Sequence, residues 1–176
     1  TGKVTVATTG QVSFDVTGLT AKGLYNTTSQ GAGVTVSAAQ GSNYAVTATS
    51  GDAAGITADG ATLAYGKVNN VTVTATKGDA YGLAAINGGT LSGDANSAVR
   101  NITVTANTAD NAAYGVYAAN GSTVKGVEAG SLTVESAGVG VGISAADNSS
   151  VSVSADSLTV SADYAAGIAA DSSTVD

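Results

Sequence analysis

The chain has 176 residues, mostly small or β-branched, with 43% hydrophobic residues, one Phe and no Cys, His, Met, Trp or Pro. The absence of His and Cys excludes Ser-His-Asp and Cys-His catalytic sites and the common zinc sites. No apolar run approaches the roughly 20 residues of a membrane-spanning helix. Thirteen acidic and six scattered basic residues give a net charge of −7, which excludes the clustered cations that bind nucleic acid or an acidic membrane. The few aromatic residues predict a narrow interior of stacked Val, Ala, Leu and Ile side chains.

The first predicted element is a short strand that recurs six times along the chain. Its apolar residues alternate with Thr or Ser, as in Ile102-Thr-Val-Thr, so one side of the strand faces an interior and the other faces solvent. Successive copies are separated by about 25 to 34 residues, and repeats of this length are typical of solenoids and propellers. The copies start at Val12, Val46, Val71, Ile102, Leu132 and Leu158.

The second predicted element contains Gly followed by a branched apolar residue. It follows the start of each first strand by less than half the length of a repeat. We expect each Gly to form a corner with unusual backbone dihedrals. An Asn or Asp follows at the next corner, where a left-handed backbone and side-chain-to-backbone turns suit these residues. The Gly pairs are Gly23-Leu24, Gly55-Ile56, Gly82-Leu83, Gly115-Val116, Gly142-Ile143 and Gly167-Ile168, and the corner residues are Asp59, Asn87, Asn120, Asp147 and Asp171.

The third predicted element is another apolar strand, which follows the Gly pair at a nearly constant distance in five of the six copies. In the first copy the nearest match, Val34, comes slightly later, and its sequence VTVSAA also resembles the first strand. We assign it to the third face of the unit or to an inserted loop. The other five matches are Leu63, Leu91, Val124, Val151 and Val175.

Three short strands in each unit of about 25–34 residues predict an all-β fold, a right-handed parallel β-helix with three strands per coil. Residues 1–176 are then a single solenoid segment, and the absence of capping sequences predicts that it is a fragment of a longer chain. One interior stack is predicted to contain Val4, Val12, Val71, Ile102, Leu132 and Leu158, and a narrower one Ala58, Ala85, Ala118, Ala145 and Ala170.

The outward positions of the first strand form a predicted ladder of hydroxyl groups. Its exterior pairs are Thr47/Thr49, Thr72/Thr74, Thr103/Thr105, Thr133/Glu135 and Thr159/Ser161. Threonine favours strands and packs well between neighbouring coils, so the ladder has a purely structural explanation. Two functional alternatives are self-association and ice binding, and the irregular spacing counts against ice binding.

Tyrosines supply the other candidate contacts. Tyr25 and Tyr117 are predicted to point outward from the second strand, where exposed aromatic residues are typical contact anchors. We expect Tyr81 and Tyr114, which precede the Gly positions, to cap an edge of the core. The candidate partner-contact residues are therefore Thr72, Thr74, Thr103, Thr105, Thr133, Thr159, Tyr25 and Tyr117.

Carboxylates offer little for catalysis. The only glutamates are Glu128 and Glu135, and the aspartates fall mainly at repeated corners, where they are typical turn residues. We therefore expect no enzymatic activity, no cofactor and no metal site. A polysaccharide-processing β-helix, which would need clustered acids, is kept as a further alternative.

The repeats resemble the passenger region of bacterial autotransporter adhesins. The resemblance rests on the V-T-V-T-A strands, on AYGVYAANGSTV at residues 113–124 and on GISAAD and GIAAD at residues 142–147 and 167–171. It implies a right-handed β-helix that is secreted to the bacterial cell surface and held in the outer membrane by a C-terminal barrel outside this sequence. It also implies adhesion, self-aggregation, biofilm formation and a role in virulence.

The leading hypothesis is thus an adhesin segment that makes multivalent contacts through its exterior. Its partner would be another copy of itself, or a protein or glycan on a host surface, with no nucleic-acid binding and no membrane insertion by this segment. The main alternative is an inert structural stalk that presents a binding or enzymatic region located elsewhere.

Overall fold

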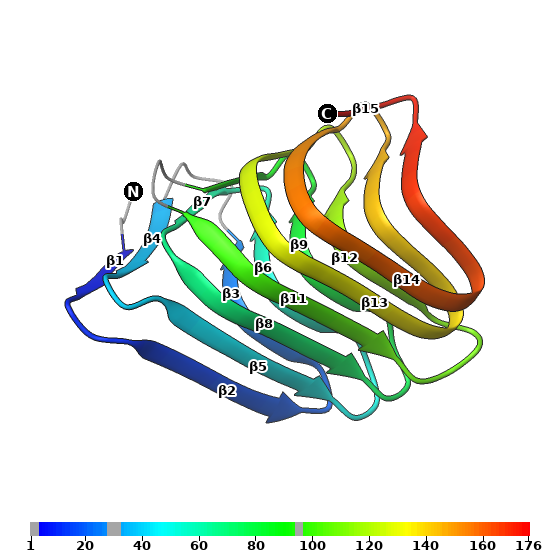
Figure 1. Ribbon diagram of the computed structural model, residues 1–176, viewed down its shortest axis with the longest axis horizontal. Helices are drawn as coiled ribbons and strands as arrows, with labels where there is room; N and C mark the ends of the chain where they lie inside the picture. Colours follow the sequence, from blue (N-terminus) through cyan, green and yellow to red (C-terminus); the bar gives the residue numbers. More distant parts are fainter. Residues whose placement is uncertain (1–3, 28–32, 94–96) are drawn as a thin grey trace.

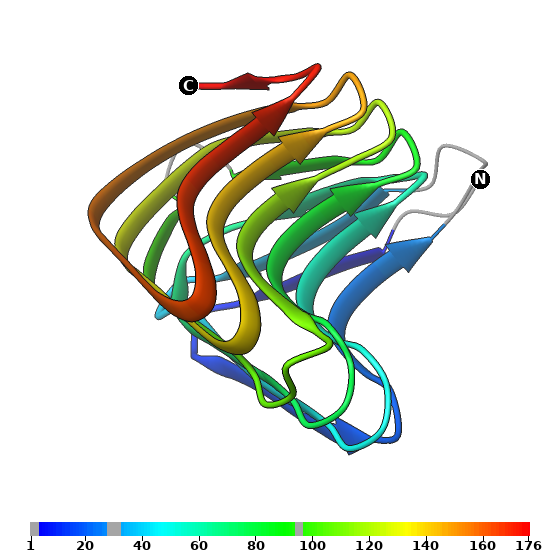
Figure 2. The ribbon, with the colours of Figure 1, turned by 90° about the vertical axis from the view of Figure 1, so that its right-hand side faces the viewer.

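The computed structural model describes residues 4–27, 33–93 and 97–176, which form strands and connecting turns, with no helix among them. It is an all-β parallel β-solenoid of about six turns, as the sequence predicts, with its coils stacked side by side (Figures 1 and 2). The strands are β1 (Val4–Thr8), β2 (Val12–Gly18), β3 (Ala21–Thr27), β4 (Gly33–Ala38), β5 (Ser42–Ala48), β6 (Ala53–Asp59), β7 (Thr62–Tyr65), β8 (Val68–Ala75), β9 (Ala80–Ile86), β10 (Thr90–Gly93), β11 (Ala98–Ala106), β12 (Ala112–Ala118), β13 (Thr123–Ala146), β14 (Ser150–Asp171) and β15 (Thr174–Val175).

Each coil contributes one strand to each of three faces, and all strand pairs are parallel. The short face contains β1, β4, β7, β10, the starts of β13 and β14, and β15. The threonine face contains β2, β5, β8, β11 and the middle parts of β13 and β14. The tyrosine face contains β3, β6, β9, β12 and the last parts of β13 and β14. The long strands β13 and β14 thus pass through all three faces.

The short face confirms the predicted third element. Val34 pairs with Leu63, and the column continues through Leu91 and Val124 to Val151 and Val175. VTVSAA is therefore a strand of the third face rather than an inserted loop. Successive positions in this column, including Val4, recur along the chain at close to the predicted coil length.

The predicted interior stack of the threonine face is wrong in its first coils. Val71, Ile102, Leu132 and Leu158 do share a column, but the earlier members are Phe14 and Tyr44. Val12 lies opposite Ser42, Val46 lies opposite Val73, and Val4 belongs to the short face. A shift of two residues keeps every side chain on its side of the strand, so alternation alone could not detect the error.

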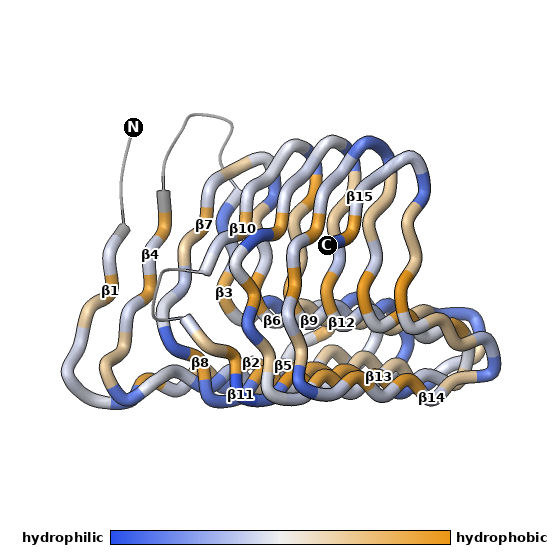
Figure 3. Tube along the Cα trace, turned by 45° about the horizontal axis from the view of Figure 1, so that its top comes forward, coloured by the Kyte–Doolittle hydropathy of each residue, from blue (hydrophilic) through white to orange (hydrophobic). Residues whose placement is uncertain are grey.

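Aromatic residues also enter the interior, which was predicted to contain only aliphatic side chains. Phe14 and Tyr44 stack with their ring centroids 4.9 Å apart. Tyr44 and Tyr65 are fully buried, each with 1% exposure. Two coils thus use large rings where later coils use Val, Ile and Leu, and Figure 3 shows the apolar residues recurring along the stacked coils.

The narrow alanine column is confirmed. Ala58, Ala85, Ala118, Ala145 and Ala170 are paired in register along the tyrosine face. In the first coil Asn26 occupies this position. Asn26 is 4% exposed, and its amide donates a hydrogen bond to the Thr62 carbonyl at 2.8 Å, so the polar side chain is accommodated by the neighbouring coil.

The paired glycines do not form corners, contrary to the prediction. Gly55, Gly82 and Gly115 lie inside β6, β9 and β12, and none has a positive φ. A Cβ on Gly115 would lie 2.6 Å from the Gly142 carbonyl oxygen and 2.5 Å from Leu132 Cδ1. The residue is Gly because the backbone passes too close to the adjacent coil and to the threonine-face core for any side chain.

The Asn/Asp corner is largely confirmed. Asn87, Asn120 and Asp147 have positive φ values of 55°, 58° and 56°. At the two other predicted corners the left-handed residue is the following one, Gly60 or Ser172.

Candidate functional site

The threonine face presents two outward columns of side chains in register, which carry hydroxyl groups at every position except Glu135. The first runs through Thr72, Thr103, Thr133 and Thr159. The second runs through Thr47, Thr74, Thr105, Glu135 and Ser161. Thr72 and Thr159 are exposed, whereas Thr74, Thr103, Thr105 and Thr133 are partly exposed. The structure thus brings all six candidate threonines onto one face.

The earliest exterior pair differs from the prediction. Thr47 pairs with Thr74 rather than with Thr72, because the first coils are shifted by two residues. Thr49 lies beyond the end of β5, and its hydroxyl donates a hydrogen bond to the Gly18 carbonyl at 3.2 Å. The position of the first column beside Thr72 is occupied by Ala45.

An asparagine ladder borders these columns. The Asn70 amide donates to Asn43 Oδ1 and the Asn101 amide donates to Asn70 Oδ1, both at 2.9 Å. The Ser131 hydroxyl extends the ladder by donating to Asn101 Oδ1 at 3.0 Å. The ladder stiffens the face, because each side chain is held by a hydrogen bond to the next coil. The recurring Asn immediately before VTVT and ITVT was the sequence signal for it, and the sequence interpretation missed it.

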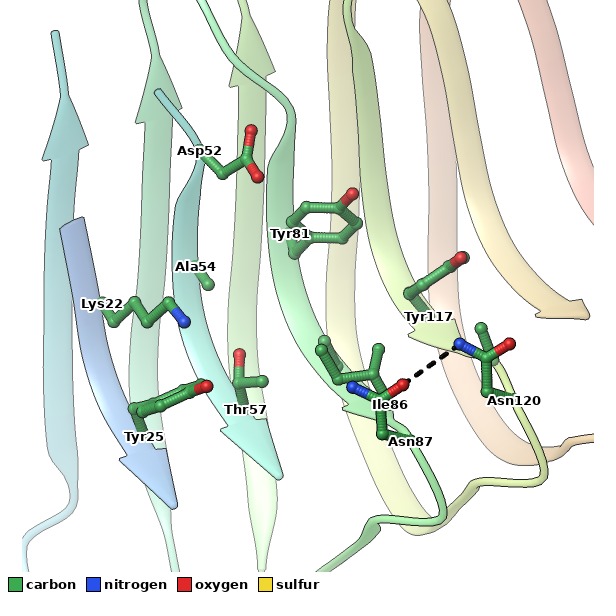
Figure 4. A pocket seen from close by; sticks show the side chains of 12 residues that line it. Lys22, Tyr25, Asp52, Ala54, Thr57, Tyr81, Ile86, Asn87, Tyr117 and Asn120 are labelled. Atoms are coloured by element: carbon green, nitrogen blue, oxygen red, sulfur yellow. Dashed lines mark hydrogen bonds between the residues drawn. The ribbon is translucent and has the colours of Figure 1, made fainter. Parts of the chain in front are cut away.

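The tyrosine face carries a groove with a cavity volume of about 260 Å³ (Figure 4). Lys22 and Tyr25 of β3 line one end, and Tyr81 of β9 and Tyr117 of β12 line the other. Ala54, Thr57 and Ala84 lie between them, and Asp52, Ile86, Asn87, Ala119 and Asn120 complete the lining. The structure therefore places both candidate tyrosines, Tyr25 and Tyr117, at this groove and away from the candidate threonines.

Tyr25 is fixed by its neighbours. Its hydroxyl donates a hydrogen bond of 2.5 Å to Asp59 Oδ2, and Lys22 Nζ lies 3.6 Å from its ring centroid. The bond from Tyr25 lowers the pKa of Asp59, and lesser contributions come from Asn87, which donates to it, and from the Lys22 charge. The opposing effect of burial is smaller. This end of the groove is thus held by a cation–π contact and a charge-assisted hydrogen bond.

Tyr81, Tyr114 and Tyr117 form an aromatic cluster at the other end. Their ring centroids are 4.7 to 5.4 Å apart, and Tyr81 and Tyr114 are stacked at 7°. Tyr81 and Tyr114 were predicted to cap the core, but they project from the outer surface beside Tyr117, in the same column as Lys22. Burial raises the pKa of all three hydroxyls, and Asp79, which accepts a hydrogen bond from Tyr81 at 3.2 Å, adds to the increase.

The two glutamates lie on the threonine face. Both belong to the middle part of β13, and their separation along the strand places them about 23 Å from each other at about 3.3 Å per residue. Carboxylate pairs in glycosidases are separated by roughly 5–9.5 Å, so Glu128 and Glu135 do not form such a pair. Glu128 instead shares an open groove with Arg100 and Asp156.

Metal ligands do not cluster in the described part of the chain, where no group of three or more Asp and Glu side chains could hold an ion. Residues 4–27, 33–93 and 97–176 also include no helix long and apolar enough to cross a membrane. No protein-family model matches the sequence, and no curated protein or solved structure matches it.

Proposed function

We propose that this chain is an adhesin segment of the autotransporter type, displayed on the bacterial cell surface, which associates with a second copy of itself through the threonine face. The observation that carries the proposal is the pair of hydroxyl columns, aligned coil by coil on one face. A hydroxyl both donates and accepts hydrogen bonds, so such a surface is complementary to itself.

The charge distribution also favours this face. Each chain carries a net charge of −7, so two copies repel each other at long range. The column of Thr72, Thr103, Thr133 and Thr159 is uncharged and allows close approach at its centre. Because four successive coils each add one hydroxyl to the column, weak individual contacts would sum to a useful affinity.

Small-angle X-ray scattering tests the arrangement of the associated species. Side-by-side pairing through the threonine face predicts that the mass per unit length doubles as the protein concentration rises. An increase in length at constant mass per unit length would indicate end-to-end stacking and would contradict the proposal. A monomer at every concentration would favour the inert stalk.

A matched pair of substitutions identifies the face. Thr103→Arg places a charge at the centre of the hydroxyl column and should abolish the doubling. Thr123→Arg places the same charge on the outward side of the short face and should leave the doubling unchanged. Equal association by both variants would exclude the threonine face.

A further inference from the structure

The groove on the tyrosine face has no role in the proposed self-association, because it opens on another face of the coil. Tyr25, Thr57, Ala84 and Tyr117 occupy one outward column on four successive coils. At about 4.8 Å per coil, Tyr25 and Tyr117 are roughly 14 Å apart along the solenoid axis. The two small residues between them leave the floor of the groove low, and Figure 4 shows the aromatic side chains at its two ends.

The lining combines aromatic surface with a few polar groups. Tyr81 and Tyr117 supply aromatic surface, and Asn87 and Asn120 supply amides whose positions are fixed by a hydrogen bond of 3.3 Å between them. Such a mixture is typical of sites that orient a small ligand by a few hydrogen bonds while burying its apolar parts. A sugar ring matches it, because one face of the ring presents C–H groups and its edge presents hydroxyls.

The charges at the groove favour a neutral ligand. Its lining contains one cation, Lys22, and one anion, Asp52. Asp79 and Asp147 act on the neighbouring tyrosines and make the surroundings acidic, which disfavours sialylated or sulfated glycans. The rings of Tyr81, Tyr114 and Tyr117 pack against one another and do not surround a cavity. They therefore offer an aromatic surface and not the aromatic cage that binds a cationic group.

Thr57 gives an independent indication of a ligand. Its side chain lies in the floor of the groove and is only 3% exposed, and its hydroxyl has no hydrogen-bond partner among the described residues. A buried polar group without a partner is unfavourable, and such groups are uncommon in native proteins. The oxygen itself is covered in the free chain, so a neighbouring side chain must rotate before a ligand hydroxyl can supply the missing partner.

We propose that this groove binds a short neutral glycan, with the ring of Tyr117 stacked on a sugar ring and Thr57, Asn87 and Asn120 bonded to its hydroxyls. The volume of about 260 Å³ lies just below the roughly 300–1,000 Å³ of typical ligand pockets, which suits a terminal sugar or a disaccharide unit. The chain would then have two contact surfaces: the threonine face for a second copy of the chain, and the groove on the tyrosine face for a neutral glycan.

Saturation-transfer NMR with a defined panel tests this proposal. The probes are glucose, galactose, mannose, N-acetylglucosamine, lactose and cellobiose, with sialyllactose and a heparin disaccharide as anionic comparisons. We expect at least one neutral sugar to bind and the anionic probes not to bind. Tyrosine fluorescence provides a second readout, because the chain has seven Tyr and no Trp. Binding of no neutral sugar, or of anionic probes alone, would overturn the proposal.

Substitutions locate the bound sugar. Tyr117→Ala should weaken binding by about tenfold or more, and Tyr117→Phe, which keeps the ring, should retain most of it. Thr57→Val removes the hydroxyl but keeps the shape of the side chain, and it should weaken sugar binding several-fold. Tyr164→Ala removes a tyrosine that is 76% exposed outside the groove and should change nothing. If Tyr117→Ala keeps full affinity while remaining folded by circular dichroism, the groove is not the site.

The two proposals can fail separately. Tyr117→Ala leaves the threonine face intact, so self-association should persist in a variant that has lost sugar binding. Thr103→Arg should lose self-association and keep sugar binding.

Discussion

Single residues set how closely the coils can pack, and the glycines of the tyrosine face show this best. A Cβ at Gly23, Gly55, Gly82, Gly115 or Gly142 would lie within 2.5 to 2.9 Å of both a carbonyl oxygen of the next coil and a side chain of the threonine-face core. These glycines therefore determine the distance between two faces of the solenoid.

Replacement of Gly115 by Ala should reduce the free energy of unfolding by about 1–3 kcal/mol, because the new methyl group overlaps Leu132 and the backbone of Gly142. The Leu132 side chain can rotate away, but the carbonyl oxygen cannot. Gly10→Ala is the control, since its Cβ would meet only Thr8 Oγ1 at 3.8 Å. Urea unfolding of both variants checks the prediction, and equal stability would contradict it.

Asn120 tests the left-handed corner. Its φ is 58°, and its amide donates to Asn87 Oδ1 at 3.3 Å. Asn120→Ala should lower the free energy of unfolding by about 1–2 kcal/mol, because Ala, unlike Gly, Asn or Asp, is strained in this conformation. Asn120→Gly loses the same hydrogen bond without the strain and should be the more stable of the two variants by thermal melting. If Asn120→Ala were the more stable variant, backbone strain at this corner would not determine the loss of stability.

At the scale of strands, the sequence predicts which elements exist better than it predicts their register. The short-face column from Val34 to Val175 was found because its apolar residues follow the Gly pair at a nearly constant distance in five of the six copies. In the first copies of the threonine face, Val12 and Val46 fitted the VTVT pattern, but Phe14 and Tyr44 hold the position. Alternation fixes which side chains point inward, whereas packing between coils, such as the Phe14–Tyr44 stack, decides which of them are neighbours.

The candidate site, too, could be predicted only in part from the sequence. Outward threonines could be predicted from alternation, and Tyr25 and Tyr117 could be placed on the outer surface. The groove could not be predicted, because it depends on four coils in register and on the small residues Thr57 and Ala84 between the tyrosines. Tyr81 and Tyr114 were misplaced because their Gly neighbours were taken for corners.

The aromatic cluster makes the chain sensitive to alkali. Tyr81 has a pKa well above its usual range when folded, because of burial and then the Asp79 and Asp52 charges. An unfolded Tyr loses its proton near pH 10, so the unfolded state binds fewer protons than the folded state above that pH, and stability falls as the pH rises. This stabilising contribution is complete below about pH 10.

Tyr81→Phe should therefore show a smaller decrease in its urea midpoint between about pH 9 and 11.5 than the unchanged chain does. Tyr114 and Tyr117, whose pKa values are also raised, should preserve part of the decrease. Tyr164→Phe is the control, because that ring is exposed. Identical pH profiles for Tyr81→Phe and the unchanged chain would exclude Tyr81 as a source of the effect.

At the scale of the whole molecule, a stack of about six coils separates its surfaces by face. The hydroxyl columns lie on the threonine face and the groove lies on the tyrosine face, so both can be occupied at once. The net charge of −7 opposes association between copies, and added salt screens this repulsion. Association through neutral hydroxyls should thus strengthen as the ionic strength rises, whereas association through ion pairs would weaken.

Sedimentation velocity across a concentration series, at low and high salt, tests self-association through the threonine face most directly. We predict a monomer that converts to a dimer as concentration rises, more readily at high salt, and that remains a monomer when Thr103 is replaced by Arg. A single monomeric species at all concentrations in both salts, or a dimer that persists in Thr103→Arg, would contradict the assignment of this face.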